Sequence, residues 1–70
     1  MKEKILKLEG KKVDITYRNA LDVEIQRKGI LVIEQDWAYV YDEGKTGNEY
    51  NGAFCLQKGH IEKIVAITEL

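Results

Sequence analysis

The sequence predicts a small all-β domain, an SH3-like barrel of five or six short strands, with residues 1–70 forming one domain. Polar and apolar residues alternate over residues 12–18 and again over residues 21–26, which is typical of strands with one face in water. Between the second stretch and residues 30–35, of which 30–33 are apolar, Gly29 permits the bend with which small barrels turn a corner. A chain of this length buries only about 60% of the surface of its unfolded form, so the core is expected to be thin.

Turn residues divide the rest of the chain. A short turn at Asn19 and Ala20 is expected to join the first two strands. Residues 1–9 fit either a short helix or an edge strand, because so few residues do not decide between the two. Glycines and polar residues make residues 42–52 a loop. Further strands are expected at residues 37–41, 53–57 and 64–68, with a turn over residues 58–63.

The composition excludes several ways of stabilising so small a chain. Cys55 is the only cysteine, so no disulfide forms within the chain, and His60 is the only histidine, so four zinc ligands of the usual kind are lacking. No cofactor is expected. Oligomerisation remains as the compensation for a thin core, and we predict a homo-oligomer.

Charge and hydropathy indicate which partners and which cellular location to expect. Eleven basic residues against twelve acidic ones give a formal net charge of −1, so any contact with nucleic acid has to be local. No apolar run approaches the roughly 20 residues of a membrane span, and the first ten residues are too charged for a signal peptide. We therefore expect a cytoplasmic protein that does not bind a membrane.

Catalytic chemistry is poorly represented. The chain has no serine, and Cys55 lies inside an apolar stretch, where a small buried filler is the expected role. The sequence GKTG at residues 44–47 resembles the end of a phosphate-binding loop, but Tyr39 stands where that motif needs its first glycine. The sequence predicts a protein that is not an enzyme.

Three aromatic residues are the most informative feature of the chain. Trp37, Tyr39 and Tyr41 lie on one face of their predicted strand, and Ala38 and Val40 lie on the other. Either set can form the core side. If the small residues face inward, the aromatic rings form an exposed stripe that suits either stacked bases, at about 1–3 kcal/mol per base, or a protein partner.

Two segments carry a resemblance to a known family. Residues 8–19, LEGKKVDITYRN, resemble the opening of the first motif of Sm and LSm proteins, and residues 58–64, KGHIEKI, look like a shortened second motif of these proteins or of their bacterial counterpart Hfq. The chain departs from the family at Ala20, where glycine is usual, and at Val40, where asparagine is expected. The stretch from Gly29 to Asp36 is also one residue longer than in the family. The matching positions are Leu8, Gly10, Val13, Ile15 and Asn19 in the first segment, and Lys58, Gly59, Ile61 and Ile64 in the second.

The resemblance implies a ring-forming oligomer that pairs its last two strands between neighbouring subunits and binds single-stranded RNA on loops around a pore. It places Asp36 in the first RNA-contacting loop, and Lys58 with His60 in the second. Because Val40 replaces the asparagine, the resemblance does not extend to the recognition of uridine-type bases.

Two functions therefore remain as hypotheses. The first is an oligomeric barrel that binds single-stranded nucleic acid, with RNA as the expected ligand. The residues expected to bind it are Asp36, Trp37, Tyr39, Tyr41, Lys58 and His60. The second is a protein-interaction or inhibitor module, of phage or mobile-element type, that docks another protein through its apolar aromatic face. In both cases residues 30–41 carry apolar side chains on both faces, so one face needs a cover from outside the core. The expected subunit contact lies at strand edges near residues 53–57 and 64–68, with part of the 30–41 face.

Overall fold

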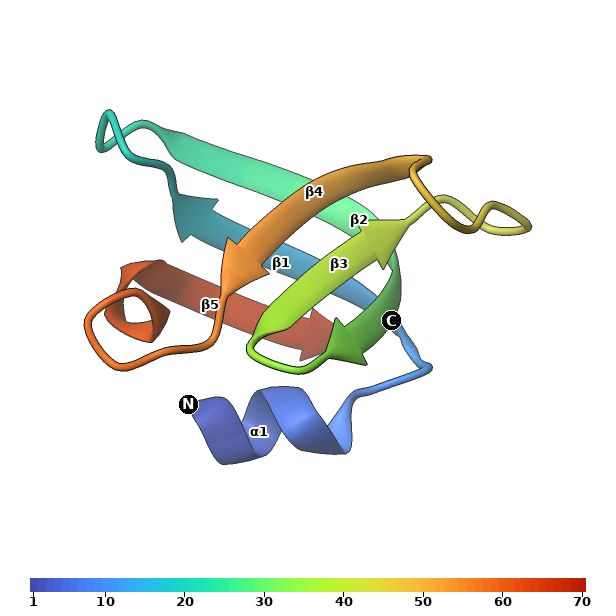
Figure 1. Cartoon of the computed structure of the whole chain (residues 1–70), viewed down its shortest axis with the longest axis horizontal. Coiled ribbons are helices and arrows are strands. Elements are labelled where there is room, and N and C mark those ends of the chain that lie inside the picture. The colour runs from blue at the N-terminus through green and yellow to red at the C-terminus, as the bar shows by residue number, and fades with distance from the viewer.

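The computed structural model describes all residues 1–70 and contains five strands and one short α-helix (Figure 1). The expected small all-β fold is confirmed. The opening residues, for which the sequence allowed a helix or a strand, form a helix. The elements are α1 (Lys2–Lys7), β1 (Lys12–Arg18), β2 (Glu24–Glu34), β3 (Trp37–Tyr41), β4 (Tyr50–Cys55), the single 3₁₀ turn η1 (Ile61–Lys63) and β5 (Ile64–Glu69).

All five strands belong to one antiparallel sheet with the order β4-β3-β2-β1-β5. The long strand β2 pairs with β1 over its first part and with β3 over its last part, and Ile30 takes part in both pairings. The sheet therefore curls around its own core, as Figure 1 shows. Strands β4 and β5 form the two edges and do not pair with each other, so the barrel remains open along one side.

Gly29 lies where β2 passes from one partner strand to the other. A Cβ atom at this position would collide with the carbonyl oxygen of Tyr41 and would lie 3.0 Å from the Cγ1 of Val40. The backbones of β2 and β3 approach so closely that only glycine fits. The predicted role of Gly29 in the bend agrees with this geometry.

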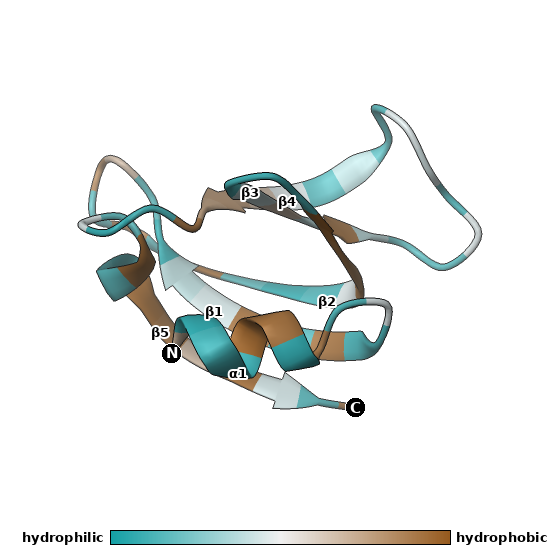
Figure 2. Cartoon of the chain, turned by 60° about the horizontal axis from the view of Figure 1, so that its bottom comes forward, coloured by the Kyte–Doolittle hydropathy of each residue, from teal (hydrophilic) through white to brown (hydrophobic).

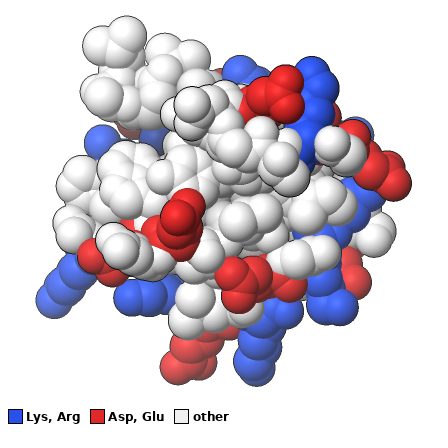
Figure 3. Space-filling view, turned by 45° about the vertical axis from the view of Figure 1, so that its right-hand side comes forward, with Lys and Arg blue, Asp and Glu red and all other residues white.

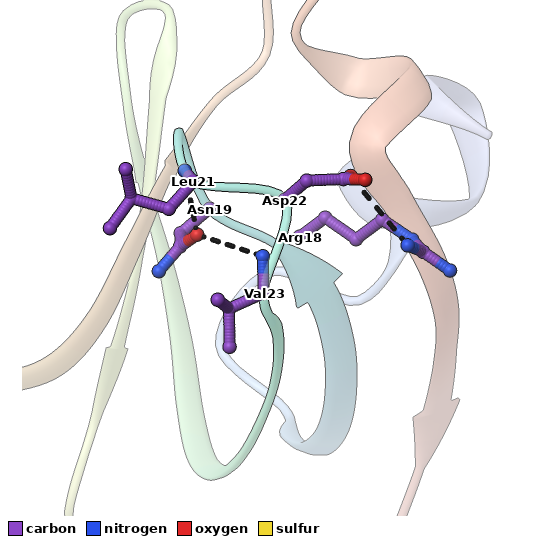
Figure 4. A network of polar contacts seen from close by, with 5 residues as sticks. All are labelled: Arg18, Asn19, Leu21, Asp22 and Val23. Atoms are coloured by element: carbon purple, nitrogen blue, oxygen red, sulfur yellow. Dashed lines mark hydrogen bonds and ion pairs between the residues drawn. The ribbon is translucent and has the colours of Figure 1, made fainter.

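The second strand begins later than the alternation of residues 21–26 predicted. Residues 19–23 form a turn in which the Oδ1 of Asn19 accepts the backbone N–H groups of Leu21 and Val23, at 2.9 and 3.1 Å (Figure 4). Asp22 completes the turn with a positive φ of 61°. The side chain of Asn19 thus satisfies two backbone N–H groups that in a strand would bond to a neighbouring strand. Strand β2 starts at Glu24, and Leu21 and Val23 point into solvent.

The fourth strand also differs from the prediction. It runs from Tyr50 to Cys55 rather than over residues 53–57, so the preceding loop is shorter than expected. Its first residue pairs with Tyr41 across an irregularity in the register, which no local pattern in a polar, glycine-rich segment could reveal. Leu56 leaves the strand and donates its N–H to the backbone oxygen of Asp36 at 2.7 Å.

The core lies inside the curled sheet. Val13, Ile15 and Tyr17 of β1 point inward at every second position, as the alternation of that strand predicted. Ile5 of α1 and the following Leu8 join the same cluster, so the helix covers one end of the barrel (Figure 2). No polar or charged residue is buried. No helix has the length and apolar character needed to cross a lipid bilayer.

Side chains connect β4 with β2 and β1 across the interior of the curled sheet. From β2, Arg27 donates its Nε–H to the backbone oxygen of Asn51 in β4 at 3.0 Å. Deeper inside, the rings of Tyr17 and Phe54 lie with their centroids 5.6 Å apart. These contacts join the two halves of the sheet without closing the gap between β4 and β5.

Candidate functional site at the open side of the barrel

The orientation of β3 decides which face carries the aromatic residues. Ala38 and Val40 are fully buried, so Trp37, Tyr39 and Tyr41 project from the outer face of the sheet. Of the two orientations that the sequence allowed, the structure shows the one with the small residues inside.

The three aromatic residues nevertheless lie in different surroundings. Tyr39, Tyr41 and Tyr50 form a tyrosine cluster whose ring centroids are 5.0–6.3 Å apart. Tyr41 is only 8% exposed, and its hydroxyl donates to the backbone oxygen of Gly47 at 2.7 Å. Burial raises the pKa of the Tyr41 phenol above its ordinary value, and the carboxylate of Glu34 raises it further. The ring of Tyr41 is thus not a free stacking surface.

The loop between β3 and β4 covers part of the outer face. An outer hollow of about 380 Å³ lies between this loop and the sheet. It is lined by Ile30, Val32, Tyr41, Asp42 and residues 44–47. Part of the two-sided apolar stretch is therefore covered by the chain itself, a contribution that the sequence prediction had omitted. Val32, Trp37 and Tyr50 remain exposed.

A second hollow, which we call the seam pocket, lies at the open side of the barrel between β4 and the η1–β5 segment. Its volume is about 300 Å³, at the lower end of the range of ligand pockets. The pairing of Tyr17 with Ile64 brings the end of β1 beside the start of β5 and completes the wall. The pocket is lined by Tyr17, Arg18, Asn19, Ala20, Ile25, Trp37, Ala53, Phe54, Cys55, His60, Lys63 and Ile64.

The charged side chains that line the seam pocket are all basic. Arg18 and Lys63 bring positive charge, His60 brings an imidazole, and no carboxylate lines the pocket. The Oδ1 of Asn19 is occupied by two backbone N–H groups, so only its Nδ2–H groups are left for a ligand. The Nη1 of Arg18 lies 3.6 Å from the Oδ1 of Asp22, but both side chains are largely in water and the pair is weak (Figure 4). In a chain with more acids than bases, this pocket concentrates hydrogen-bond donors.

Two segments predicted to contact RNA lie side by side. Besides the backbone bond to Leu56, the carboxylate of Asp36 accepts a bond from the Nε2 of Gln57 at 3.3 Å. Trp37 follows directly and is 46% exposed at the pocket, while Lys58 and His60 lie in the exposed segment after Gln57. The structure therefore gathers Trp37 and His60 in the seam pocket, with Lys58 in the adjoining turn.

Tyr39 and Tyr41 do not belong to the seam pocket, and Asp36 faces Gln57 rather than the pocket. Sequence reasoning missed Arg18, Asn19 and Lys63, which line it. Lys63 lies in the segment 58–64 together with His60, so the resemblance of that segment could have drawn attention to it. Arg18 and Asn19 required the pairing of β1 with β5, which no local pattern indicates.

The rest of the surface is electrostatically mixed. On the side shown in Figure 3, uncharged side chains occupy the middle, and lysine, arginine and carboxylate groups are interspersed, mostly toward the border. No group of three or more histidine, cysteine, aspartate or glutamate side chains is placed to hold a metal ion.

Comparison with known proteins finds no family whose model matches the chain, and no curated protein or solved structure with significant similarity.

Proposed function

We propose that this chain is a non-enzymatic, self-associating β-domain that binds single-stranded nucleic acid, RNA in preference, at the seam pocket. The observation that carries the proposal is the composition of this pocket. An exposed indole, two cationic side chains, an imidazole and an amide donor surround an apolar floor. No carboxylate lines the pocket, and the nearby Asp22 forms only a weak, solvent-exposed pair with Arg18.

This combination is the one that single-stranded nucleic acids use. An unstacked base offers its flat face to an aromatic ring and its edge to hydrogen-bond donors, while a few cations contact the backbone. Such binding needs no large basic surface, which agrees with the formal net charge of −1. A duplex would require far more phosphate contacts than the pocket offers.

The proposal is tested by fluorescence polarisation with single-stranded RNA at low salt. The unmodified protein should bind with modest affinity, and Trp37→Ala should weaken binding by about 5- to 150-fold, since stacking on one base contributes about 1–3 kcal/mol. Tyr50→Ala is the matched control, because Tyr50 is similarly exposed, at 44%, but lies outside the pocket. Absence of RNA binding by the unmodified protein refutes the proposal, and equal losses in both variants remove the seam pocket as the site.

Self-association is proposed from the two unpaired edges of the sheet. Strand β4 contains no charged residue and β5 contains only one, Glu69, so neither edge carries the lysines that often prevent edge-to-edge pairing. Val65 is 48% exposed on β5. A neighbouring copy that paired its β5 with β4 would satisfy both edges and cover apolar surface that the thin core leaves in water.

Sedimentation equilibrium at micromolar concentration tests the assembly. Val65→Asp should dissociate it without unfolding the subunit, because Val65 is outside the core. Val23→Asp, at a comparably exposed valine in the β1–β2 turn, should leave the assembly intact. Ile67 is unsuitable for this test, since it is buried in the core and a charge there would unfold the chain itself. A stably folded monomer of 8.1 kDa would refute self-association.

A second candidate function is the docking of another protein on the outer face. The exposed side chains of Val32 and Tyr50 favour it, together with the near-neutral charge. Co-purification followed by sequencing of bound RNA and identification of bound protein separates the two. A specific protein partner without RNA, whose binding is lost in Tyr50→Ala and retained in Trp37→Ala, would support this second function.

A further inference from the structure

The basic and acidic side chains are unevenly divided between residues 1–12 and the rest of the chain. Residues 1–12 contain five lysines against two glutamates, a side-chain net charge of +3. Residues 13–70 contain six basic against ten acidic side chains, a net charge of −4. The formal net charge of −1 therefore conceals a basic segment at α1 and the turn that follows it.

The lysines of residues 1–12 are exposed to solvent and form no ion pair. Ile5 and Leu8 anchor the segment to the core, whereas all five of its lysines are exposed. The one ion pair of the structure joins Arg18 to Asp22, so none of these lysines is neutralised by a carboxylate within 4.0 Å. We use the name α1 lysine face for the exposed lysines of this segment, with the exposed carboxylates of Glu3 and Glu9 among them. They are Lys2, Lys4, Lys7, Lys11 and Lys12.

The α1 lysine face begins close to the seam pocket. In both Figure 1 and Figure 2 the N-terminal end of α1 lies beside the η1–β5 segment. Ile61 of η1 packs against the same core cluster as Ile5 of α1. His60 and Lys63 line the pocket and lie within two residues of Ile61, with Glu62 between Ile61 and Lys63. The pocket and α1 therefore meet at the same part of the core.

We propose that the α1 lysine face is a second, sequence-independent contact surface for the phosphate backbone of the strand bound at the seam pocket. The inference rests on the proposed function. Lysine suits this role because its ammonium is a compact charge on a flexible stem, which follows a mobile backbone without a fixed geometry. The seam pocket would hold a base, and the lysines would hold the flanking phosphates, so that a chain with a formal net charge of −1 binds a polyanion.

The salt dependence of RNA binding tests whether the α1 lysine face contacts phosphates. Each phosphate contact to a single strand contributes about 0.7 to the slope of log K against log salt concentration. The variant Lys4→Gln/Lys7→Gln should therefore reduce the steepness of that slope by about 1.4. The matched control is Lys28→Gln/Lys45→Gln, which removes the same charge from exposed lysines outside residues 1–12 and should leave the slope unchanged.

The outcomes separate this inference from the proposed function. If the unmodified protein binds no RNA, both fail together. If it binds and the α1 variant keeps the full slope, or if the control variant lowers the slope equally, the α1 lysine face has no specific role while the seam pocket stands. Circular dichroism should show both variants folded, because all four lysines are exposed.

Discussion

Replacing Gly29 by alanine should be among the most damaging single-methyl changes in this chain. The added Cβ would collide with the carbonyl oxygen of Tyr41, and this oxygen belongs to the backbone of β3, which is held by pairing with β2 on one side and β4 on the other. Overpacking of this kind costs about 1–3 kcal/mol, and a rigid obstacle places Gly29→Ala at the upper end. For 70 residues, the whole free energy of unfolding is about 4–10 kcal/mol. We therefore expect a loss of roughly 3 kcal/mol, a large part of the total.

Urea denaturation at one fixed protein concentration measures this loss. The control is Gly52→Ala, whose Cβ would lie 3.1 Å from the Cγ of Arg27 and 3.2 Å from the hydroxyl oxygen of Tyr17. Both obstacles are side-chain atoms that can move, so the loss should be only about 1 kcal/mol. The reasoning fails if Gly29→Ala costs less than about 0.5 kcal/mol, or if the two variants lose the same stability.

Three further predictions concern the turn, the edge strand and the tyrosine cluster. Asn19→Ala removes the acceptor of two backbone N–H groups and should lower the free energy of unfolding by about 1–2 kcal/mol, whereas Leu21→Ala, in the same turn but exposed, should stay within about 0.5 kcal/mol; equal denaturation midpoints would contradict this. Cys55 is half-buried and should react with a thiol reagent more slowly in the native protein than in urea, so equal rates would argue against its burial. Because the folded state raises the pKa of Tyr41, the unfolded chain loses this proton first, and stability should fall as the pH rises above about 10. Tyr41→Phe should weaken that fall; an unchanged alkaline unfolding curve would show that Tyr41 is not its cause.

The parts of the fold that were predictable depend on patterns within one strand. The alternation of Val13, Ile15 and Tyr17 located β1 and its buried face, and Gly29 marked the bend of β2. The start of β2 was missed because the side chain of Asn19 diverts the following residues into a turn. The start of β4 was missed because the pairing of Tyr50 with β3 is tertiary.

The candidate site was predictable to a similar extent and for the same reason. Trp37 and His60 carry recognisable chemistry in their own segments, and the structure brings both into the seam pocket. Tyr41 has the same aromatic chemistry, but a loop covers it. Arg18 and Lys63 are ordinary surface charges until β1 and β5 pair and place them on one pocket.

The pairing of β1 with β5 also determines the order in which the domain can fold. Strands β1 to β4 follow one another as neighbours in the sheet, so their contacts are local, whereas Ile15 of β1 faces Ile67 near the other end of the chain. Closing so long a loop is slow, so β5 is expected to dock last. Until it does, the edge of β1 is open to the β5 of another molecule, and the connecting residues 56–63 act as the hinge of a strand exchange. Refolding at high protein concentration should therefore yield exchanged dimers that contain every contact of the monomer, formed between two chains.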